Sequence, residues 1–435
     1  MELGRIVCYQ EAIAYIDEIP KFTKKNGFDI SKEFYAFLQK PANNCTIFHV
    51  AGTNGKGSVC AYLDSICREA GLKTGLFTSP HLVDIRERFR LQGEWISQED
   101  FLDCFQIVAN QVLAFRKTEG HEEYHPTFFE YLFFMAMLYC EKKQVQVLVL
   151  ETGLGGRLDT TNVIDHPAVS VITEIGMDHM EYLGNSIAEI AVEKAGIIKA
   201  GCPVVYVDKR PESSAVIEQI AAEKNSPCKG VSKSAIKFIG FQNKIIDFSY
   251  QCGYDNNILS LQTTAFYQME NAATAVTALL ESGLEVSMDT IKKGLFQCKW
   301  EGRMEEILPQ VFLDGAHNVD GIDAFLEGVE RDHFTGKRYL LFSAVADKEV
   351  NLMKEKLVSS GLFSGFMTAP LESSRGVKKE DLQKLFRDME IQIFDCPENG
   401  LEYFLQNRNG DCRLYIVGSL YLVGQIKEYL LKRSS

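Results

Sequence analysis

The amino-acid sequence predicts an α/β protein of two domains, each built on a mostly parallel sheet that helices cover. Three observations predict this fold class. The chain has 435 residues, about three times the length of a ~150-residue domain. Short apolar segments alternate with amphipathic ones from residue 46 to residue 207, and a second alternating series begins at residue 311. Such alternation is typical of parallel sheets with helices packed on their faces.

Composition and charge indicate a packed core and an acidic balance. Hydrophobic residues make up 46% of the chain and charged residues 24%, which is typical of globular rather than disordered proteins. The formal net charge of -13 at pH 7 repels phosphate polymers and anionic lipids. We therefore expect small-molecule partners, and neither nucleic-acid nor membrane binding.

Targeting and redox features favour a cytoplasmic location. The first twenty residues lack the basic segment, apolar run and cleavage site of a secretory signal. The longest apolar stretch, 128–140, contains Glu130 and is shorter than the roughly 20 residues that cross a bilayer. The 12 cysteines are scattered and form no C-x-x-C pair, as expected of reduced and mostly buried thiols. We expect a cytoplasmic protein without a membrane span.

Apolar runs and helical periodicity define the elements of the first domain. Expected strands cover 46–52, 74–79, 146–151, 168–175 and 203–207, and expected helices cover 58–70, 98–117, 127–141 and 186–194. The run 146–151 is too uniformly apolar for a half-exposed strand, so we place it in the middle of the sheet. From 229 to 263 the pattern changes to short alternating segments parted by Asn, Gly and Asp, which predicts antiparallel hairpins on the sheet edge.

The second domain repeats the strand and helix series. Helices near 266–282 and 287–295 close the first half, and new strands follow at 311–315 and 338–345, with helices from 319, over 349–358 and up to about 432. We place the boundary near 297–302, which gives domains of residues 1–298 and 299–435. Because no low-complexity linker separates these halves, a cleft between them is the expected site.

A glycine-rich turn lies between the first expected strand and the helix that follows it. Its residues are Gly52, Thr53, Asn54, Gly55, Lys56, Gly57 and Ser58. Glycines let the backbone fold around phosphate, Lys56 can reach the outer phosphates, and Ser58 can face Mg²⁺. The turn departs from G-x-x-x-x-G-K-[ST], because Gly57 separates lysine from serine. We expect a nucleoside triphosphate here; the alternative is an ordinary glycine turn with a solvated lysine.

Polar residues follow two further strands of the same sheet. Glu151 ends one strand, and Asp178 and His179 lie just past another. Parallel sheets hold ligands at the carboxyl ends of their strands, and a carboxylate is a natural Mg²⁺ ligand. Taken singly, Glu151 could be an ordinary strand-end acid and His179 a structural histidine. Their shared edge with Ser58 favours a magnesium site.

Two weaker signals gain from this context. Lys194 lies near a helix end beside Glu193, where a lysine also merely suits the helix dipole. Asp314 and His317 follow the first strand of the second domain in the segment DGAHN, which suggests a polar loop at a ligand edge. Arg303 precedes that strand.

Nine motifs occur in one order across residues 52 to 318, and as a set they are highly specific. They are GTNGKGS, TSPHL, PTFFE, ETGLGGRLDTTN, IGMDH, EKAGIIK, MENAATA, WEGRME and DGAHN. On these motifs the chain resembles the folylpolyglutamate synthases, with or without dihydrofolate synthase activity, of the Mur ligase superfamily. The region after 318 matches only by its strand pattern and by SAVADK (343–348).

The resemblance implies a fold and a reaction. The fold is an N-terminal, P-loop-type, mostly parallel sheet domain with an antiparallel edge, followed by a smaller Rossmann-like domain. The reaction is ATP-dependent addition of L-glutamate to the γ-carboxylate of a folate through an acyl phosphate. Conversion of dihydropteroate to dihydrofolate stays open, as does oligomeric state, for which a monomer is expected from two cleft-forming domains.

The resemblance also implies roles for individual residues. The catalytic residues that it implies are Lys56, His179 and Lys194. The nucleotide contacts are Gly52, Thr53, Asn54, Gly55, Lys56, Gly57, Ser58, Asn271, Arg303, Asp314 and His317. Two Mg²⁺ ions are held by Ser58, Ser79, Glu151, His179 and Lys194, the last as a carbamate formed with CO₂. The pterin pocket is lined by Thr127, Phe129 and Asp159, although this chain has Thr160 where many relatives carry Ala, and Phe129 could equally belong to the core.

Two other readings remain. Within the superfamily, the alternative is a peptidoglycan-precursor ligase that adds an amino acid to a UDP-muramyl substrate, but the GLGGRLD and EKAGIIK forms of the motifs favour folate. From another class, the chain could be a non-catalytic nucleotide switch or scaffold. A switch needs neither the metal constellation nor the second-domain DGAHN segment.

Overall fold

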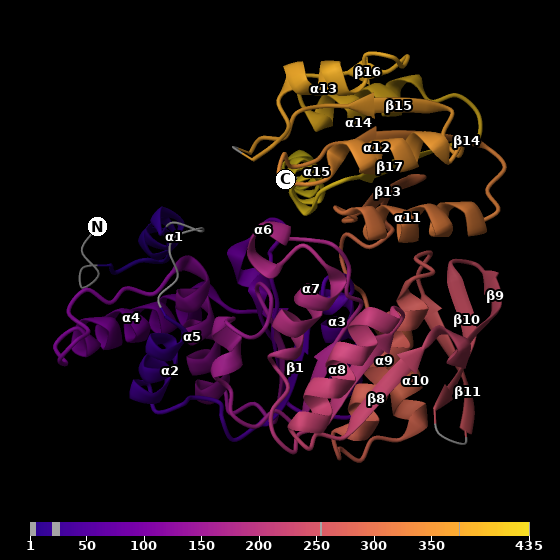
Figure 1. The fold of residues 1–435 in the computed structure, drawn as a ribbon. Helices are drawn as coiled ribbons and strands as arrows, with labels where there is room; N and C mark the ends of the chain where they lie inside the picture. Colours follow the sequence, from indigo (N-terminus) through magenta and orange to yellow (C-terminus); the bar gives the residue numbers. More distant parts are fainter. Residues whose placement is uncertain (1–5, 20–26, 253–254, 374, 435) are drawn as a thin grey trace.

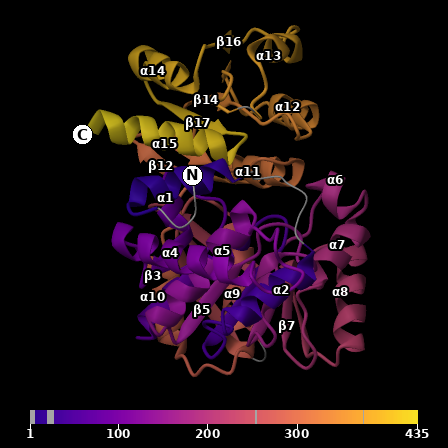
Figure 2. The same cartoon turned by 90° about the vertical axis from the view of Figure 1, so that its left-hand side faces the viewer.

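The computed structural model describes residues 6–19, 27–252, 255–373 and 375–434 (Figure 1). The expectation of no secretory signal falls partly on residues 1–5 and residue 20, and the predicted hairpins include 253–254; these residues lie outside the described ones. Figures 1 and 2 show the later elements, in orange and yellow, stacked on the earlier ones, in purple to salmon. No helix among the described residues combines the length and the apolar character that a bilayer crossing requires. All 12 cysteines are free thiols.

The earlier part of the chain is built on an eight-stranded sheet. Its order is β4-β3-β2-β5-β1-β6-β7-β8, and all neighbours are parallel except at β3 and β4. The strands are β1 (Thr46–Ala51), β2 (Thr74–Phe77), β3 (Phe89–Leu91), β4 (Glu94–Trp95), β5 (Val147–Glu151), β6 (Val169–Ile172), β7 (Val204–Asp208) and β8 (Cys228–Ser232). Strand β5 lies between β2 and β1, which confirms its predicted place in the middle of the sheet.

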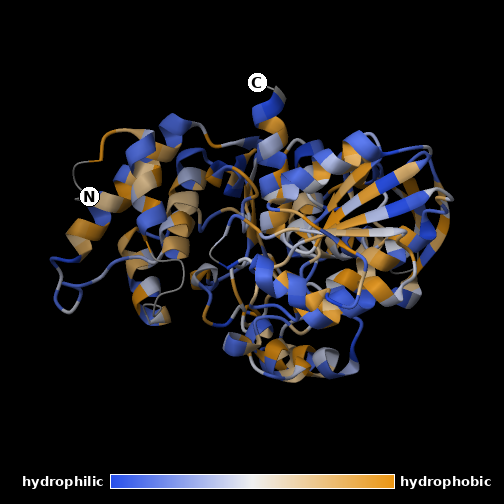
Figure 3. Ribbon diagram, turned by 90° about the horizontal axis from the view of Figure 1, so that it is seen from above, coloured by the Kyte–Doolittle hydropathy of each residue, from blue (hydrophilic) through white to orange (hydrophobic). Residues whose placement is uncertain are grey.

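Helices cover both faces of this sheet because successive strand residues point to opposite sides. In β5, Leu148 and Leu150 join one apolar cluster, while Val147 and Val149 join another. The first cluster is covered by α1 (Tyr9–Glu18), α2 (Phe28–Phe37), α4 (Gln98–Phe115) and α5 (Phe128–Lys142). The second is covered by α3 (Lys56–Glu69), α9 (Gln268–Glu281) and α10 (Met288–Gln297), and a third cluster joins α7 (Ile187–Ala195) and α8 (Pro211–Glu223) to β6 and β7. Figure 3 shows helices with both hydrophobic and hydrophilic residues, as expected when one face is buried.

The predicted antiparallel edge exists, but the prediction placed it wrongly. The segments that were expected to form it make a separate three-stranded sheet of β9 (Ile236–Gln242), β10 (Ile245–Cys252) and β11 (Asp255–Gln262). Alternate residues Ile246, Phe248 and Tyr250 pack into the cluster with α9 and α10, so a helix layer buries the apolar face of these hairpins. The antiparallel edge of the large sheet is β3 and β4, where no strand was predicted.

The later part of the chain contains a six-stranded sheet of order β12-β13-β17-β14-β15-β16, parallel except at β12. Its strands are β12 (Glu305–Leu308), β13 (Val311–Asp314), β14 (Lys337–Phe342), β15 (Gly365–Thr368), β16 (Gln392–Ile393) and β17 (Cys412–Val417). One face packs against α11 (Val319–Arg331), α12 (Val350–Ser359) and α13 (Lys379–Leu385), and the other against α14 (Pro397–Asn407) and α15 (Leu420–Ser434). We call β12 to α15 the C-terminal part and α1 to α10 the N-terminal part; a domain boundary at 298/299 stays a prediction.

The topology decides where a ligand can lie. Strands β2, β5, β1 and β6 are neighbours and parallel, so their carboxyl ends meet at one edge of the large sheet. The segments after these strands carry the glycine turn, Ser79, Glu151 and His179. The C-terminal part approaches this edge through the start of α11 (Figure 1). Open α/β sheets bind ligands at such an edge.

Candidate active site

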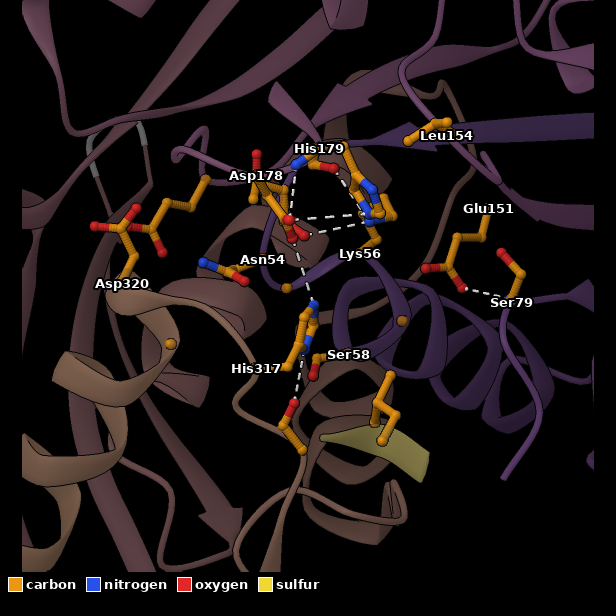
Figure 4. Close-up of a pocket in the computed structure, with 18 of the residues that line it drawn as sticks. Asn54, Lys56, Ser58, Ser79, Glu151, Leu154, Asp178, His179, His317 and Asp320 are labelled. Carbon is orange, nitrogen blue, oxygen red and sulfur yellow. Dashed lines mark hydrogen bonds and ion pairs between the residues drawn. The ribbon is translucent and has the colours of Figure 1, made fainter. Parts of the chain in front are cut away.

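A cavity of about 1060 Å³ lies at this edge, with walls from both parts of the chain. Figure 4 shows part of its lining, with Lys56, Glu151 and His179 on one side and His317 on the other. The predicted site residues that line it are Gly52, Thr53, Asn54, Gly55, Lys56, Gly57, Ser58, Ser79, Thr127, Phe129, Glu151, Asp159, His179, Lys194, Asn271, Arg303, Asp314 and His317. The structure therefore brings every predicted site residue to one cavity, while their individual roles stay predictions.

The glycine turn has a backbone that only glycine accommodates. Gly52 has φ 148° and Gly55 has φ 90°, both in the region that L side chains rarely adopt. A Cβ on Gly52 would lie 1.8 Å from Oγ1 of Thr173, and one on Gly55 would lie 2.3 Å from Oδ1 of Asn271. The turn leads directly into α3, so its backbone N–H groups lie at a helix N-terminus, where anions bind.

Two lysines converge on the carbonyl of Gly52. Nζ of Lys56 donates to the carbonyl oxygens of Gly52 (3.1 Å) and Thr53 (3.2 Å), and Nζ of Lys194 donates to Gly52 at 2.7 Å. Lys194 is only 4% exposed, and no ion pair joins it to a carboxylate among the described residues. Burial, together with the charge of Lys56, lowers the pKa of Lys194 to about 7. A substantial fraction of this amine is therefore neutral at physiological pH.

Three predicted oxygen donors, Ser58, Ser79 and Glu151, line the same cavity. Glu151 is 3% exposed, and its Oε2 accepts a hydrogen bond from the backbone N–H of Ser79 (3.0 Å). Burial raises the pKa of Glu151, against the lowering effect of Lys56 and of the Ser79 hydrogen bond. The hydroxyl of Ser58 accepts from Nε2 of Gln268 at 3.1 Å. A buried carboxylate and hydroxyls are the hard oxygen donors that Mg²⁺ prefers.

His179 lines the cavity from the segment after β6, where it is the N-cap residue of the short helix α6 (Met180–Leu183). Its φ of 51° lies in the left-handed region, a strained conformation that is common at functional sites. Burial lowers the pKa of His179 to about 4, with Lys348 and Lys56 adding to the effect and Asp178 opposing it. The imidazole is therefore neutral at pH 7 and able to donate a nitrogen lone pair to a metal. No group of three or more His, Cys, Asp and Glu side chains within the described ranges forms a metal cluster; only Glu151 and His179 of the predicted ligands belong to these types.

The carboxylate of Asp178 connects the two parts of the chain. It pairs with Lys348 and accepts from Nδ2 of Asn318 at 3.3 Å. It also lies 3.5 Å from Nε2 of His317 (Figure 4). Burial acts to raise the pKa of Asp178, but the hydrogen bond and charge of His317, with Lys348, outweigh it and hold the pKa well below its usual range. Asn318 also exchanges hydrogen bonds with Asn54 (3.0 and 3.3 Å), so the glycine turn contacts the C-terminal part directly.

We expect a large loss of stability when the ion pair between Asp178 and Lys348 is broken. Lys348 and Asp178 expose only 8% and 7% of their side chains, so Asp178→Ala leaves a buried ammonium without its carboxylate. We expect the free energy of unfolding, measured by urea titration, to fall by about 3–5 kcal/mol. Asp347→Ala, which breaks the half-exposed pair with Arg375, should cost at most about 1 kcal/mol. Equal losses in the two variants would contradict the central place of Asp178.

Asp314 holds the loop that enters the cavity from the C-terminal part. Its carboxylate accepts from the hydroxyl of Tyr267 (2.7 Å) and from the backbone N–H groups of Met304 (3.0 Å) and Ala316 (2.8 Å). Burial raises the pKa of Asp314, while Arg303 and these hydrogen bonds oppose the rise. Asp314 therefore ties β13 to the segment that carries Arg303 and to α9.

The predicted pterin side lies at the start of α5. Thr127 caps this helix in a capping box with Glu130, which fixes the entry of the chain into the cavity wall. The ring of Phe129 packs against Gly153, where a Cβ would lie 2.6 Å from it. The carboxylate of Asp159 accepts from the N–H groups of Gly153 (3.0 Å) and Leu154 (2.8 Å), and from Thr161. Asp159 thus shapes the loop that faces Phe129.

Several site residues were not assigned from the sequence. Asp178 lies in the motif IGMDH and Lys348 in SAVADK. Because the two residues are 170 positions apart, no local sequence pattern predicts that they form a pair. Gln268 orients Ser58 from α9, one residue before MENAATA. Arg88 lines the cavity from the segment after β2. The sequence does not single it out, because several other charged residues stand beside it.

Comparison with known proteins agrees with this geometry. Residues 50–279 match the family model described as the Mur ligase middle domain. The chain is 34% identical to the dihydrofolate synthase/folylpolyglutamate synthase of Bacillus subtilis, over 97% of this chain and 99% of that protein. It is 30% identical to the folylpolyglutamate synthase of Lacticaseibacillus casei, over 97% and 99%.

Solved structures extend the likeness to the whole fold. E. coli FolC in complex with DHPP and ADP has a TM-score of 0.87 and 28% identity, with 99% of each chain covered. The bifunctional Yersinia pestis enzyme complexed with AMPPNP and Mn ion has a TM-score of 0.85 and 28% identity, with 98% of each chain covered. With the cavity and its residues in place, these matches identify the chain as an ATP-dependent ligase that belongs to the dihydrofolate synthase/folylpolyglutamate synthase family of the Mur ligases.

Proposed function

We propose that this chain adds L-glutamate to the γ-carboxylate of a folate and converts ATP to ADP and phosphate. The observation that carries this proposal is the meeting, in one cavity, of the glycine turn, the Glu151 and His179 edge, and the Asp314 to His317 loop. The relatives from B. subtilis and L. casei carry folylpolyglutamate synthase in their names. The peptidoglycan-precursor alternative has support only at the level of the superfamily.

The chemistry requires activation of a carboxylate. A carboxylate oxygen attacks the γ-phosphorus of ATP, ADP leaves, and an acyl phosphate results. The amine of glutamate then attacks the acyl carbon, and phosphate leaves from the tetrahedral intermediate with loss of the amine proton. In phosphoryl transfer the protein acts by positioning and by neutralising charge. In this chain, Lys56 and the N–H groups of the glycine turn supply the positive charge that neutralises the phosphate oxygens.

The residues present fit the divalent cation that such reactions use. Ser58, Ser79 and Glu151 offer hydroxyl and carboxylate oxygens, and the neutral imidazole of His179 offers a nitrogen, all on one cavity. Bound Mg²⁺ would neutralise the phosphate oxygens. Glu151 itself accepts the Ser79 N–H, so its carboxylate also fixes the segment after β2.

Lys194 is proposed to carry CO₂ as a carbamate. A neutral amine adds to CO₂ and releases a proton, which turns a cation into an anionic oxygen ligand. Lys194 suits this reaction because it is buried, has no ion-pair partner among the described residues, and has a pKa lowered to about 7 by burial. A carbamate there would complete a second Mg²⁺ site with His179.

The pterin side supports a folate substrate without fixing its oxidation state. The cavity is lined here by Thr127, Phe129 and the loop that Asp159 holds. Leu154 and Leu158 lie in the same lining and make this wall apolar. Dihydropteroate would enter the same space, so dihydrofolate synthase activity is a second candidate, in line with the bifunctional name of the B. subtilis relative. We also propose a monomer, because both parts of one chain contribute to the cavity. The free thiols support a cytoplasmic location.

One assay tests the proposed function. Purified protein receives ATP, Mg²⁺ and labelled glutamate, with tetrahydrofolate or dihydropteroate as the acceptor, and products are resolved by mass. We expect ADP release only when acceptor and glutamate are both present. ADP release that needs no amino acid would favour the nucleotide switch, and ligation to a UDP-muramyl acceptor alone would favour the peptidoglycan alternative.

Arg303 tests whether the C-terminal part contributes to ATP binding. Its guanidinium lines the cavity beside Gly315, where a Cβ would lie 2.6 Å from Nη1, and no ion pair holds it within the described part of the chain. Because a charged hydrogen bond to phosphate would be lost, Arg303→Ala should raise the KM for ATP about 10-fold or more. Arg408→Ala, on an exposed helix end, serves as control. An ATP saturation curve that matches the unchanged protein would argue against this contribution.

A further inference from the structure

Arg88 is a buried cation that faces the cavity and that neither the fold nor the assigned nucleotide contacts explain. It ends the 3-10 helix Ile85–Arg88 after β2, and its residue is 6% exposed. Its side chain nevertheless lines the cavity. Removing a guanidinium from water is costly unless an anion or several acceptors compensate it.

The contacts of Arg88 within the protein are few. Its Nε–H donates to Nδ1 of His81 at 2.9 Å, and its guanidinium carbon lies 5.5 Å from the centre of the Phe128 ring. Among the described residues, no carboxylate forms an ion pair with it, whereas Arg86 in the same helix pairs with Asp84 at 2.6 Å. Burial lowers the pKa of Arg88 only to about 10, so the side chain stays charged at neutral pH.

The two carboxylates whose charge acts on Arg88, Glu87 and Glu151, already accept other hydrogen bonds. Glu87 accepts the backbone N–H groups of Leu82 (2.7 Å), Val83 (2.8 Å) and Asp84 (2.8 Å), which closes the loop that carries Arg88. Glu151 accepts from Ser79 and faces the predicted magnesium side. Because no hydrogen bond engages the outer nitrogens of Arg88 among the described residues, they are open to an acceptor from outside the chain.

The position of Arg88 in the cavity indicates which hydrogen-bond acceptor of a ligand it could bind. Phe128 begins the helix of the predicted pterin side, and Glu151 belongs to the predicted magnesium side. Tyr421, from the C-terminal part, lines the same cavity and is close enough to influence the pKa of Arg88. Arg88 thus lies between the predicted pterin side and the predicted magnesium side, the region where the proposed ligation requires an acceptor carboxylate to reach ATP.

We propose that Arg88 binds a substrate carboxylate in this cavity through its two outer nitrogens; this inference rests on the proposed function. A guanidinium presents two parallel N–H donors that match both oxygens of a carboxylate, which a lysine ammonium cannot do. Two sources supply this chemistry: the glutamyl or pteroyl acceptor, and the incoming glutamate. Arg88 is therefore a specificity residue for one of these two acids.

The test measures KM separately for each substrate in Arg88→Lys, Arg88→Met and the matched control Arg86→Met. We expect KM to rise about 10- to 100-fold for one acid in both Arg88 variants, while KM for ATP stays within about 2-fold. A rise for glutamate identifies the amino acid as the ligand, and a rise for the folate or dihydropteroate identifies the acceptor. Arg86 is paired with Asp84 and does not line the cavity, so its variant should keep all three values.

A second readout keeps the proposal testable if Arg88→Met folds poorly. Arg88→Ala should recover at least about 10-fold in kcat/KM for the affected acid when methylguanidinium is added, whereas a merely structural role gives no such recovery at constant thermal stability. Unchanged KM values for both acids in Arg88→Lys, or no recovery in a folded Arg88→Ala, would overturn the assignment. The unchanged protein is assayed first: absence of ligation there counts against the proposed function, and ligation with unaltered Arg88 variants counts against Arg88 alone.

Discussion

Lys194→Ala is expected to abolish ligation and to leave the fold intact. The side chain is buried in the lining of the cavity, and the hydrogen bond that it makes among the described residues goes to the carbonyl of Gly52 at 2.7 Å. If it carries a carbamate, its loss removes an anionic metal ligand beside the transferred phosphate. Removal of one group that stabilises transition-state charge costs about 10²- to 10³-fold in kcat. The fold should survive because alanine removes a buried amine whose charged form burial already disfavours.

The control for this variant is Lys199, a partly buried lysine in the same segment. Lys199 donates to the carbonyl of Asn162 at 2.8 Å, and burial lowers its pKa to about 8, but it does not line the cavity. Lys199→Ala should therefore keep kcat within a few-fold of the unchanged protein. With ¹³C-labelled bicarbonate, a carbamate carbon signal should appear in the unchanged protein and in Lys199→Ala, and disappear in Lys194→Ala. Full activity of Lys194→Ala would remove the carbamate hypothesis.

The sequence predicted the large sheet well because buried parallel strands have a simple signature. The runs at β1, β5 and β6 are apolar on both faces, since helices cover both sides of the sheet, and no tertiary information is needed to read them. The site followed from the same logic. Polar residues after parallel strands must share an edge, so Glu151 and the glycine turn were expected to converge, and they line one cavity.

The sequence failed where tertiary context decides. Residues 236–262 alternate as an edge hairpin would, and periodicity alone cannot tell whether a sheet or the α9 and α10 layer covers the apolar face. The short strands β3 and β4 have only 3 and 2 residues, below the length at which alternation can be recognised. The Asp178 and Lys348 pair joins the two parts of the chain, so only the assembled fold reveals it.

Glu151→Gln is expected to cause the other large loss, about 10²- to 10³-fold in kcat, with a higher Mg²⁺ concentration needed for half-maximal rate. Glutamine keeps the shape of the side chain, and its carbonyl oxygen can still accept the N–H of Ser79, so the segment after β2 stays in place. The substitution removes the negative charge, which the divalent cation requires of this ligand.

The comparison that separates a metal ligand from a general acidic residue is Glu174→Gln. Glu174 also follows a strand and lines the cavity, but its carboxylate pairs with Lys209 at 2.5 Å. We expect that variant to keep its Mg²⁺ dependence and to lose only a few-fold in rate. Both variants should bind ATP equally in the absence of metal, measured by fluorescence titration, because neither carboxylate is among the predicted nucleotide contacts. If Glu151→Gln kept the kcat and Mg²⁺ requirement of the unchanged protein, the buried carboxylate at the end of β5 would serve only to fix Ser79, and the cation would have to be held elsewhere in the cavity.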